Sequence, residues 1–478
     1  MTRNTAIEFA ERYFDDGRFL DDLARRVAQR TQSQQAESAA VLRAYLNDEM
    51  EAALGKLGFI SALYDNPVAN GAPFLIARRI ENPAWPTVLI YGHGDVVRGQ
   101  DEQWTHGAGP WQVAIEEDRW YGRGSADNKG QHTINFGALG AVMDARVEAG
   151  QPLGFNVTVL MEMGEEVGSP GLNELCAALK EELRADVLIA SDGPRISAAR
   201  PTVFLGSRGA ANFELSVTAR AKAYHSGNWG GLLSNPAVRL AHALASLIDE
   251  KGRVRVEGLR AAPIDAPVAA AIADLEVGTD PGDPVIDTEW GEPGLTPAER
   301  VFGSNTLEVL AMVAGNPAQP VGAIPAVSRA FCQLRFVVGT DIARLEACLR
   351  TYLDQHGFPD VDVRVTLVAP ATRLAPDHPW VNWAVRSITQ TTGKKVAILP
   401  NLGGTIPNDA FADVLGLPTI WIPHSYPGCA QHAPNEHMLG SVAREALRLM
   451  AGLFWDLGEV SAAKLRRESR VIAPENAR

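Results

Sequence analysis

The sequence predicts an α/β protein in which a smaller α+β domain is inserted into a larger domain with a mostly parallel central sheet flanked by helices. Three observations support this fold class. The chain has 478 residues, which is too long for one compact core, because single cores stop growing at about 250–300 residues. Short apolar runs, typical of buried strands, are separated by segments long enough for helices. Near residue 205 these runs give way to alternating strands, and the earlier pattern returns in the last part of the chain.

The larger domain is expected to comprise residues 1–205 and 370–478. Its first element is an amphipathic helix at residues 38–59, where apolar side chains recur at helical spacing. A last helix is expected at residues 441–457, followed by a loosely held charged tail at residues 464–478. Buried strands are expected at residues 87–91, 156–161, 186–190 and 418–422. Together these elements indicate a parallel or mixed sheet covered by helices.

Residues 206–369 are expected to form the inserted α+β domain, which we interpret as ferredoxin-like. One helix should begin at Pro236 after the cap Asn235, because proline at the first helical position loses no needed N–H. A stretch rich in proline, glycine and acidic residues follows at about residues 262–300. The expected strands are residues 212–219, 330–338 and 361–368, and the expected helices are residues 236–249 and 341–355.

The composition excludes several classes of function. Asp and Glu number 57 against 44 Lys and Arg, and a net charge of -13 disfavours nucleic acid as a partner. The four cysteines are scattered without a CxxC pair, which argues against a disulfide framework and a cysteine metal site. The sequence has no run of about 18 apolar residues to span a membrane, and residues 1–20 lack the apolar core of a secretory signal. A cytoplasmic protein that contacts no membrane is expected.

Polar side chains follow each of the four predicted buried strands. In open α/β sheets ligands bind at the carboxyl ends of the strands, so these side chains are expected to converge on one crevice. Taken singly, a histidine after a strand or an aspartate before a glycine is more often a structural or turn residue. Turn chemistry does not explain why all four loops carry hard metal ligands. The side chains concerned are His93, Asp95, Glu165, Glu166, Asp192 and His432.

A glycine-rich stretch at residues 121–130 adds Asp127 to this set. By itself Asp127 could simply cap the helix that follows, and the stretch lacks the spacing of a phosphate-binding loop. Two histidines and at least four carboxylates suit a pair of divalent ions that share a bridging carboxylate. Of the adjacent Glu165 and Glu166, one would be a ligand and the other a base that takes a proton from metal-bound water. The set therefore predicts a two-metal hydrolase.

As an ordered set, the motifs around these residues resemble those of the M20 metallopeptidases, in particular the carnosinase-like dipeptidase and aminoacylase group. The motifs are residues 93–95, 124–130, 165–166, 191–193 and 432–436. The resemblance implies that His93 and Asp192 hold one metal ion and that Glu166 and His432 hold the other. Asp127 would bridge the two ions. Zinc is the expected metal, with manganese and cobalt as alternatives.

The same resemblance implies further roles. Glu165 would be the general base, and Asp95 would orient His93. His225 matches a lid histidine that reaches across a dimer interface to the partner's active site and stabilises the oxyanion. The alternative for His225 is a turn histidine before Gly227. The resemblance therefore implies a homodimer that assembles through the inserted lid domain.

A substrate with a free carboxylate is also implied. Arg335 matches an arginine that clamps this carboxylate bidentately. Gly403, Gly404 and Thr405 resemble a loop that offers backbone N–H groups and a hydroxyl to the same carboxylate. One departure is Gly322, which stands where these dipeptidases carry a threonine that helps to bind substrate. A dipeptide, an N-acyl amino acid and an N-carbamoyl compound therefore all remain candidate substrates.

The predicted function is hydrolysis of a peptide or amide bond in a small substrate, with metal-bound water as the nucleophile. The rival class is a non-catalytic relative that binds or assembles other proteins. Such a relative would be free to lose the base or the metal ligands. Because Glu165 and every matched ligand position are retained, an enzyme is the favoured prediction.

Overall fold

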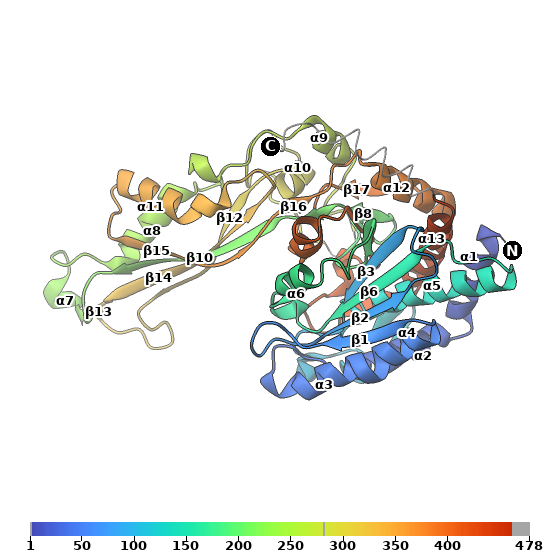
Figure 1. The fold of residues 1–478 in the computed structure, drawn as a ribbon. Coiled ribbons are helices and arrows are strands. Elements are labelled where there is room, and N and C mark those ends of the chain that lie inside the picture. The colour runs from blue at the N-terminus through green and yellow to red at the C-terminus, as the bar shows by residue number, and fades with distance from the viewer. Residues whose placement is uncertain (1, 281–282, 461–478) are drawn as a thin grey trace.

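The structure, a computed structural model, describes residues 2–280 and 283–460, and its elements form two lobes (Figure 1). One lobe is built around an eight-stranded sheet and the other around a four-stranded sheet. The predicted tail at residues 464–478 lies outside the described residues. The predicted α/β fold class is confirmed.

The large sheet is mixed, with parallel strands at its centre. In spatial order its strands are β1 (Ile60–Tyr64), β2 (Phe74–Arg79), β6 (Asn156–Glu162), β3 (Thr87–His93), β7 (Val187–Ala190), β18 (Thr419–Trp421), β8 (Thr202–Phe204) and β17 (Ala397–Leu399). The four strands predicted from apolar runs, β6, β3, β7 and β18, run parallel to one another. Three strands run antiparallel to this centre: β2, which opposes β6, β8, which opposes β18, and β17, which is parallel to β8. The edge strand β1 opposes β2 and therefore runs in the same direction as the centre. The site-bearing part of the sheet is thus its parallel centre.

Helices cover both faces of the large sheet. The first face is covered by α1 (Arg3–Asp15), α2 (Arg18–Val27), α5 (Lys129–Glu148), α12 (Pro379–Thr392) and α13 (Gly440–Gly458). The second face is covered by α6 (Leu172–Ala178), a π-helical turn (Ala410–Val414), α9 (Ala266–Ile272) and α10 (Pro297–Phe302). Alternate side chains of β3 enter the two layers: Val88 and Ile90 pack into the first core, and Leu89 and Tyr91 into the second.

The first predicted helix forms, but it is not a regular α-helix throughout. α3 (Ala39–Ala44) continues through a π-helical turn (Tyr45–Met50) into α4 (Glu51–Lys56). Such a turn inserts extra backbone and redirects the side chains of one helical face. Tyr45 is fully buried beneath the loop that follows β3, and a Cβ atom on Gly94 would collide with its ring. The close approach of this loop to the helix therefore requires glycine at position 94.

The smaller lobe has the strand and helix order of a ferredoxin-like fold. Along the chain its elements are β10 (Gly209–Thr218), α8 (Pro236–Leu247), β12 (Thr306–Ala314), β14 (Val327–Phe336), α11 (Leu345–Gln355) and β15 (Val361–Ala369). The strands form an antiparallel sheet in the order β12-β14-β10-β15. α8 begins at Pro236 as predicted, and the Asn235 side chain accepts a hydrogen bond from the backbone N–H of Ala237 at 2.9 Å.

Short pairings mark the two ends of the smaller lobe. At its junction with the larger lobe, β9 (Gly206–Ser207) pairs with β16 (Thr372–Arg373). At the opposite end, β11 (Tyr224–His225) and β13 (Ala323–Ile324) pair beside α7 (Ser226–Trp229), far from the large sheet (Figure 1). In the larger lobe, β4 (Ala114–Glu116), β5 (Arg119–Tyr121) and β19 (His437–Leu439) form a separate three-stranded sheet.

The described residues of the stretch rich in proline and glycine, 262–280 and 283–300, pack against the larger lobe, although they lie within the predicted inserted domain. Val268 and Ile272 of α9, and Phe302 of α10, share a core with Phe204 and Trp421 of the large sheet. The smaller lobe has a core of its own between its sheet and α8 and α11. Residues 206–369 therefore contribute to both lobes, and the predicted boundaries themselves remain a prediction.

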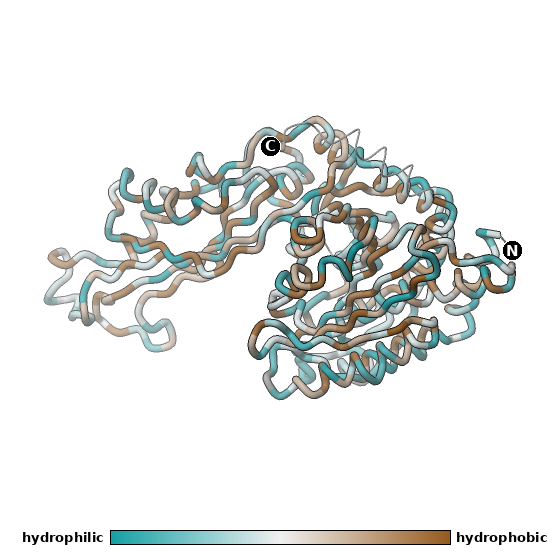
Figure 2. The backbone as a smooth tube through the Cα atoms, in the orientation of Figure 1, coloured by the Kyte–Doolittle hydropathy of each residue, from teal (hydrophilic) through white to brown (hydrophobic). Residues whose placement is uncertain are grey.

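Hydropathy follows this layered arrangement. Hydrophobic residues concentrate along the central strands, whereas hydrophilic residues dominate the outer helices (Figure 2). Among the described residues, no helix combines the length and the apolar composition needed to cross a membrane.

Candidate metal centre

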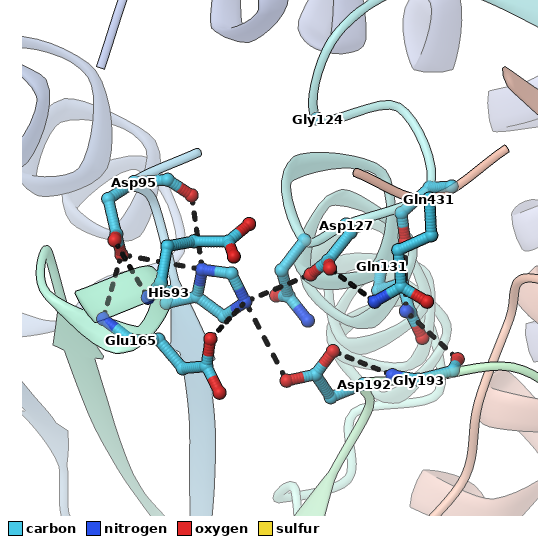
Figure 3. Close-up of polar contacts among 12 residues, drawn as sticks. His93, Asp95, Gly124, Asp127, Gln131, Glu165, Asp192, Gly193 and Gln431 are labelled. Atoms are coloured by element: carbon cyan, nitrogen blue, oxygen red, sulfur yellow. Dashed lines mark hydrogen bonds and ion pairs between the residues drawn. The ribbon is translucent and has the colours of Figure 1, made fainter. Parts of the chain in front are cut away.

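The predicted ligands lie on loops at the carboxyl edge of the large sheet. His93 is the last residue of β3, and Glu165 and Glu166 begin a short 3-10 turn (Glu165–Val167) after β6. Asp192 closely follows β7. Because these strands are parallel, their carboxyl ends meet at one edge, and the loops face one another around His93 (Figure 3).

His93, Asp127 and Asp192 form one compact group of candidate ligands. The Nε2 atom of His93 lies 3.1 Å from Oδ1 of Asp127 and 3.6 Å from Oδ2 of Asp192 (Figure 3). All three side chains are buried, and one donor atom from each lies within 4.8 Å of the others. One cation can contact all three, because bonds from zinc to imidazole nitrogen or carboxylate oxygen are about 2.0–2.2 Å long.

Asp127, Glu166 and His432 form a second group. The Nε2 atom of His432 lies 3.1 Å from Oδ2 of Asp127 and 3.0 Å from Oε2 of Glu166. The donor atoms of this group also lie within 4.8 Å of one another. Asp127 belongs to both groups, since its Oδ1 faces His93 and its Oδ2 faces His432. A carboxylate with this position can bridge two cations.

Asp95 links the loop of His93 to the turn that carries the two glutamates. The Nδ1 atom of His93 lies 3.1 Å from the backbone oxygen of Asp95 and 3.4 Å from its Oδ1, which leaves Nε2 directed at Asp127. The Asp95 carboxylate also accepts the backbone N–H groups of Glu165 at 3.2 Å and Glu166 at 3.1 Å. One buried carboxylate is therefore positioned to orient both a candidate ligand and the candidate base.

Negative charge accumulates at this edge of the sheet. Burial raises the pKa of Glu165 well above its ordinary value; His93 opposes this rise and Asp192 adds to it. Burial, with a further contribution from Asp127, raises the pKa of Glu166 to about 7. Ionising all these carboxylates together is costly unless cations compensate the charge. A donor set of buried carboxylate oxygens and imidazole nitrogens therefore fits divalent cations such as zinc.

Sequence reasoning missed Gln131, a buried side chain on the first turn of α5. Its Nε2 donates to the backbone oxygen of Gly193 at 3.3 Å (Figure 3). The same nitrogen donates to the backbone oxygen of Ala126 at 2.9 Å, and Oε1 accepts the N–H of His424 at 2.9 Å. Ala126 directly precedes Asp127, Gly193 directly follows Asp192, and His424 lies in the loop after β18. One amide thus braces three loops of the centre.

A sequence signal for this brace exists in the polar residues that α5 presents at helical spacing. Asn128, Gln131, His132 and Asn135 are separated by three or four positions, and all four are buried. Asn128 donates to the backbone oxygen of Ser191 at 2.7 Å, and Asn135 donates to its hydroxyl at 3.0 Å. A buried polar stripe at the start of a helix indicates a network that positions neighbouring loops.

Glu436 positions the loop of Asp127, although its motif had suggested no role for it. Its carboxylate accepts the backbone N–H groups of Gly124 at 3.1 Å, Ala126 at 2.9 Å and Asp127 at 3.0 Å. It also forms a buried ion pair with Arg123 at 2.8 Å. Gln431 hydrogen-bonds to Oδ2 of Asp127 from the other side (Figure 3). Asp127 is thus held through both its backbone and its side chain.

A cavity of about 660 Å³ opens onto the candidate ligands and contains the predicted carboxylate-binding residues. Nη1 of Arg335 donates to the Thr405 hydroxyl at 2.7 Å, and this hydroxyl donates to the backbone oxygen of Arg208 at 3.0 Å. Gly403 and Gly404 line the same cavity. Its walls also include Asp127, Glu165, Asp192 and His432. The chain therefore brings its candidate base, metal ligands and carboxylate anchor together.

His225 is not brought into this group. It lies at the far end of the smaller lobe, where its exposed side chain accepts the backbone N–H of Gly227 at 3.1 Å. This local contact caps the short helix α7. Within the described part of one chain, His225 does not line the cavity that holds the candidate ligands.

Two kinds of dipeptidase are among the curated proteins that this chain resembles. Over 176 residues the chain is 37% identical to a cysteinylglycine-S-conjugate dipeptidase of Corynebacterium striatum, which covers 36% of this chain and 37% of the relative. Over 190 residues it is 33% identical to a β-Ala-His dipeptidase of Mus musculus, which covers 39% of this chain and 37% of the relative. The chain thus spans less than two fifths of the length of these curated relatives.

Solved structures share the whole fold. Human carnosine dipeptidase 1 superposes with a TM-score of 0.78 at 22% identity, over 95% of this chain and 99% of that one. An M20 family metallo-carboxypeptidase from Sulfolobus solfataricus superposes with a TM-score of 0.78 at 24% identity, over 92% of this chain and 99% of that one. The predicted resemblance is confirmed by the model of peptidase family M20/M25/M40, which matches residues 89–456, and the chain therefore belongs to that family.

Proposed function

We propose that this protein is a metal-dependent hydrolase that cleaves a peptide or amide bond in a small substrate with a free carboxylate. The observation that carries the proposal is the position of Asp127 between two ligand groups. In the same cavity lie Glu165 and the pair formed by Arg335 and Thr405. Membership of a peptidase family and the dipeptidase names of its relatives support the same class of reaction.

Two divalent ions per chain are the proposed cofactor, with zinc favoured over manganese or cobalt by the mixed nitrogen and oxygen donors. His93 and Asp192 would hold one ion and Glu166 and His432 the other, with Asp127 shared between them. When bound, such ions polarise the scissile carbonyl group and make water easier to deprotonate. Asp95 would keep Nε2 of His93 free for its ion through the contacts at Nδ1.

Glu165 is the proposed general base. Its Oε2 lies 4.0 Å from Nε2 of His93, so it sits beside the ligands. The Glu165 carboxylate would accept a proton from the attacking water as the water oxygen bonds to the carbonyl carbon. The same proton then passes to the leaving nitrogen as the C–N bond breaks. Because burial raises the pKa of Glu165, its carboxylate is a stronger base than an exposed glutamate.

The substrate carboxylate is proposed to bind Arg335, the Thr405 hydroxyl and the backbone N–H groups of the loop at Gly403 and Gly404. A guanidinium group pairs with a carboxylate through two parallel hydrogen bonds. Arg335 is held by a hydrogen bond from its Nε to Oε1 of Gln333 at 2.8 Å, and its Nη1 is directed at the Thr405 hydroxyl. An anchored carboxylate would keep the scissile bond near Glu165.

A homodimer through the smaller lobe is proposed to complete the site with His225 of the second subunit. The edge strand β12 exposes Val309, Leu310, Met312 and Val313, and an exposed apolar edge strand favours association. A two-fold interface would deliver each His225 to the other chain's cavity. There its imidazole would donate a hydrogen bond to the oxyanion.

Metal content and substrate screening test this function directly. We expect two ions per chain in fully loaded protein by plasma emission, loss of activity on chelation and recovery on adding zinc, manganese or cobalt. Dipeptides, N-acyl amino acids and N-carbamoyl amino acids would be screened as substrates, and their cleavage would be followed by mass spectrometry. His93→Ala and His432→Ala should each weaken one ion, and Asp127→Ala should weaken both. About one ion per wild-type chain would refute the two-metal proposal.

A further inference from the structure

We propose that the substrate residue with the free carboxylate has an apolar side chain, which an apolar wall of the cavity receives. The wall consists of Ile196, Val277, Ile286, Phe302 and Leu402, all of which line the 660 Å³ cavity. This inference rests on the proposed hydrolase function and names its substrate class. It concerns the side chain of the substrate residue that bears the carboxylate. The carboxylate anchor binds the carboxylate and does not discriminate between side chains.

The wall lies beside the carboxylate anchor. Leu402 directly precedes the anchor glycines Gly403 and Gly404 in the chain. A Cβ atom on Gly403 would lie 3.1 Å from Cγ1 of Val301, the neighbour of Phe302, so α10 packs against the anchor loop. In an α-amino acid the side chain branches from the carbon that bears the carboxylate. A carboxylate bound at Gly403 therefore brings that side chain next to the wall.

Few charged groups in this cavity are free to receive a polar side chain. Arg195 is buried and forms an ion pair with Glu445 at 2.7 Å. The Asp283 carboxylate accepts the backbone N–H of Asp280 at 2.9 Å. The other charged lining residues are the candidate metal ligands, Glu165 and Arg335, which already have roles at the scissile bond and the carboxylate. The remaining wall is suited to hydrocarbon.

The wall is anchored to the loop that carries Asp192. The Asp280 carboxylate accepts the backbone N–H of Ala198 at 3.0 Å, and Arg200 pairs with Asp274 at 2.6 Å. Gly278 has a φ of +75°, and a Cβ atom there would lie 2.9 Å from Cδ1 of Ile286. Glycine at this position therefore allows Ile286 to pack closely. The wall is formed before substrate arrives, so binding an apolar group requires little ordering of the protein.

Substrates with an apolar side chain at this wall should differ strongly in kcat/KM from substrates with a charged one. Each methylene group that enters an apolar pocket changes kcat/KM by about 10-fold or more. A lysine or aspartate side chain would instead lose hydration against the hydrocarbon of the wall. We therefore expect substrates that end in leucine or phenylalanine to be preferred over those that end in lysine or aspartate.

The test uses the metal-loaded full-length protein and two matched substrate series, glycyl dipeptides and N-acetyl amino acids, that differ only in the residue with the free carboxylate. We expect kcat/KM for leucine and phenylalanine to exceed that for lysine and aspartate by about 10-fold or more. Equal rates would overturn the inference and leave the hydrolase function standing. If no member of either series were cleaved and the N-carbamoyl amino acids were not cleaved either, the proposed function would fail and the inference with it.

A pair of neighbouring valine and isoleucine variants shows whether the wall itself sets the preference. Ile286 lines the cavity, whereas the adjacent Val285 is 96% exposed and does not line it. Ile286→Asp should lower kcat/KM for leucine substrates by about 10-fold and raise the relative rate with lysine, with metal content unchanged. Val285→Asp, which adds the same charge one residue away, should retain the wild-type preference. If both variants keep that preference, the wall does not contact the substrate side chain.

Discussion

The carboxyl edge of the large sheet and the outer end of the smaller lobe differ in how completely one chain builds them. At the sheet edge, His93, Asp127 and Asp192 are buried. The Gln131 amide donates hydrogen bonds to the loops of Asp127 and Asp192, and the Asp95 carboxylate accepts hydrogen bonds from the turn that follows β6. At the outer end, His225 is exposed and contacts its own turn. Both ends carry residues that the family resemblance assigns to one reaction.

This difference indicates where assembly matters. A metal centre requires several donors within a few ångströms, and short loops on parallel strands can supply them within one chain. A single hydrogen-bond donor for the oxyanion requires only one side chain, so another subunit can supply it. The sheet edge should therefore tolerate dissociation of the proposed dimer, whereas catalysis should not.

The base gives the largest expected effect. Glu165→Gln should lower kcat by about 10²–10⁴, the range for loss of a general base, while metal content stays at the wild-type level because the ligands are untouched. Steady-state kinetics and plasma emission on the same preparation would check both parts. Glu166→Gln is the matched control, and it should lose metal as well as activity. Near-normal turnover of Glu165→Gln would show that Glu165 is not the base, whereas loss of metal by Glu165→Gln but not by Glu166→Gln would mean that the two roles are reversed.

The next largest effect is expected from removing the His225 side chain at the outer end of the smaller lobe. His225→Ala should lower kcat by about 10²–10³, because it removes the proposed donor to the oxyanion. Since His225 lies away from the metal ligands, the variant should remain dimeric and fully loaded with metal. Light scattering, plasma emission and kinetics would measure the three properties. A drop in metal content would contradict the separation of the two regions.

Mixing two inactive variants shows whether His225 acts across the interface. A heterodimer of Glu165→Gln and His225→Ala has one site with both an intact base and a donor histidine from the other chain. Random exchange makes half of the dimers mixed, so about a quarter of the wild-type activity per site should return. Exchange of subunits without any recovery would assign His225 to its own chain or to no catalytic role.

The central sheet was predictable because its strands carry a local signal. β3, β6, β7 and β18 are short apolar runs, and buried parallel strands have this composition. β1 could not be recognised in the same way, because its residues are exposed or half-buried at the sheet edge. β8 and β17 were not predicted, although with three residues each they are no shorter than β18. Their place in the sheet depends on contacts with distant parts of the chain.

The candidate ligands were predictable for a related reason. His93 and Asp192 lie at the carboxyl ends of strands predicted to be parallel. Because such ends meet at one edge of the sheet, the sequence already implied that these two residues lie close together. The packing of residues 262–300 against the large sheet had no such signal. Val268 and Phe302 occupy a core with Trp421, and nothing in the local pattern distinguishes this core from that of the smaller lobe. The wall of the cavity therefore became visible only in three dimensions.

The smallest effect concerns Gln131, which contacts no ligand side chain yet braces the loops of Asp127 and Asp192. Gln131→Leu removes the donor to the backbone oxygens of Ala126 and Gly193. Partners outside the ligand shell typically contribute about 10–100-fold to metal affinity, so zinc affinity measured by chelator competition should fall by this amount.

A general loss of stability could imitate this effect, and Thr133→Val separates the two explanations. Thr133 is also buried on α5, where its hydroxyl donates to the backbone oxygen of Lys129 at 2.5 Å and accepts from Arg26, but it does not contact the loops of Asp127 or Asp192. Thr133→Val should lower the melting temperature while zinc affinity stays near the wild-type value. If Gln131→Leu and Thr133→Val weaken zinc binding equally, α5 supports the sheet edge through its overall packing. A loss of zinc affinity with Gln131→Leu alone would instead show that the Gln131 amide positions both ligand loops.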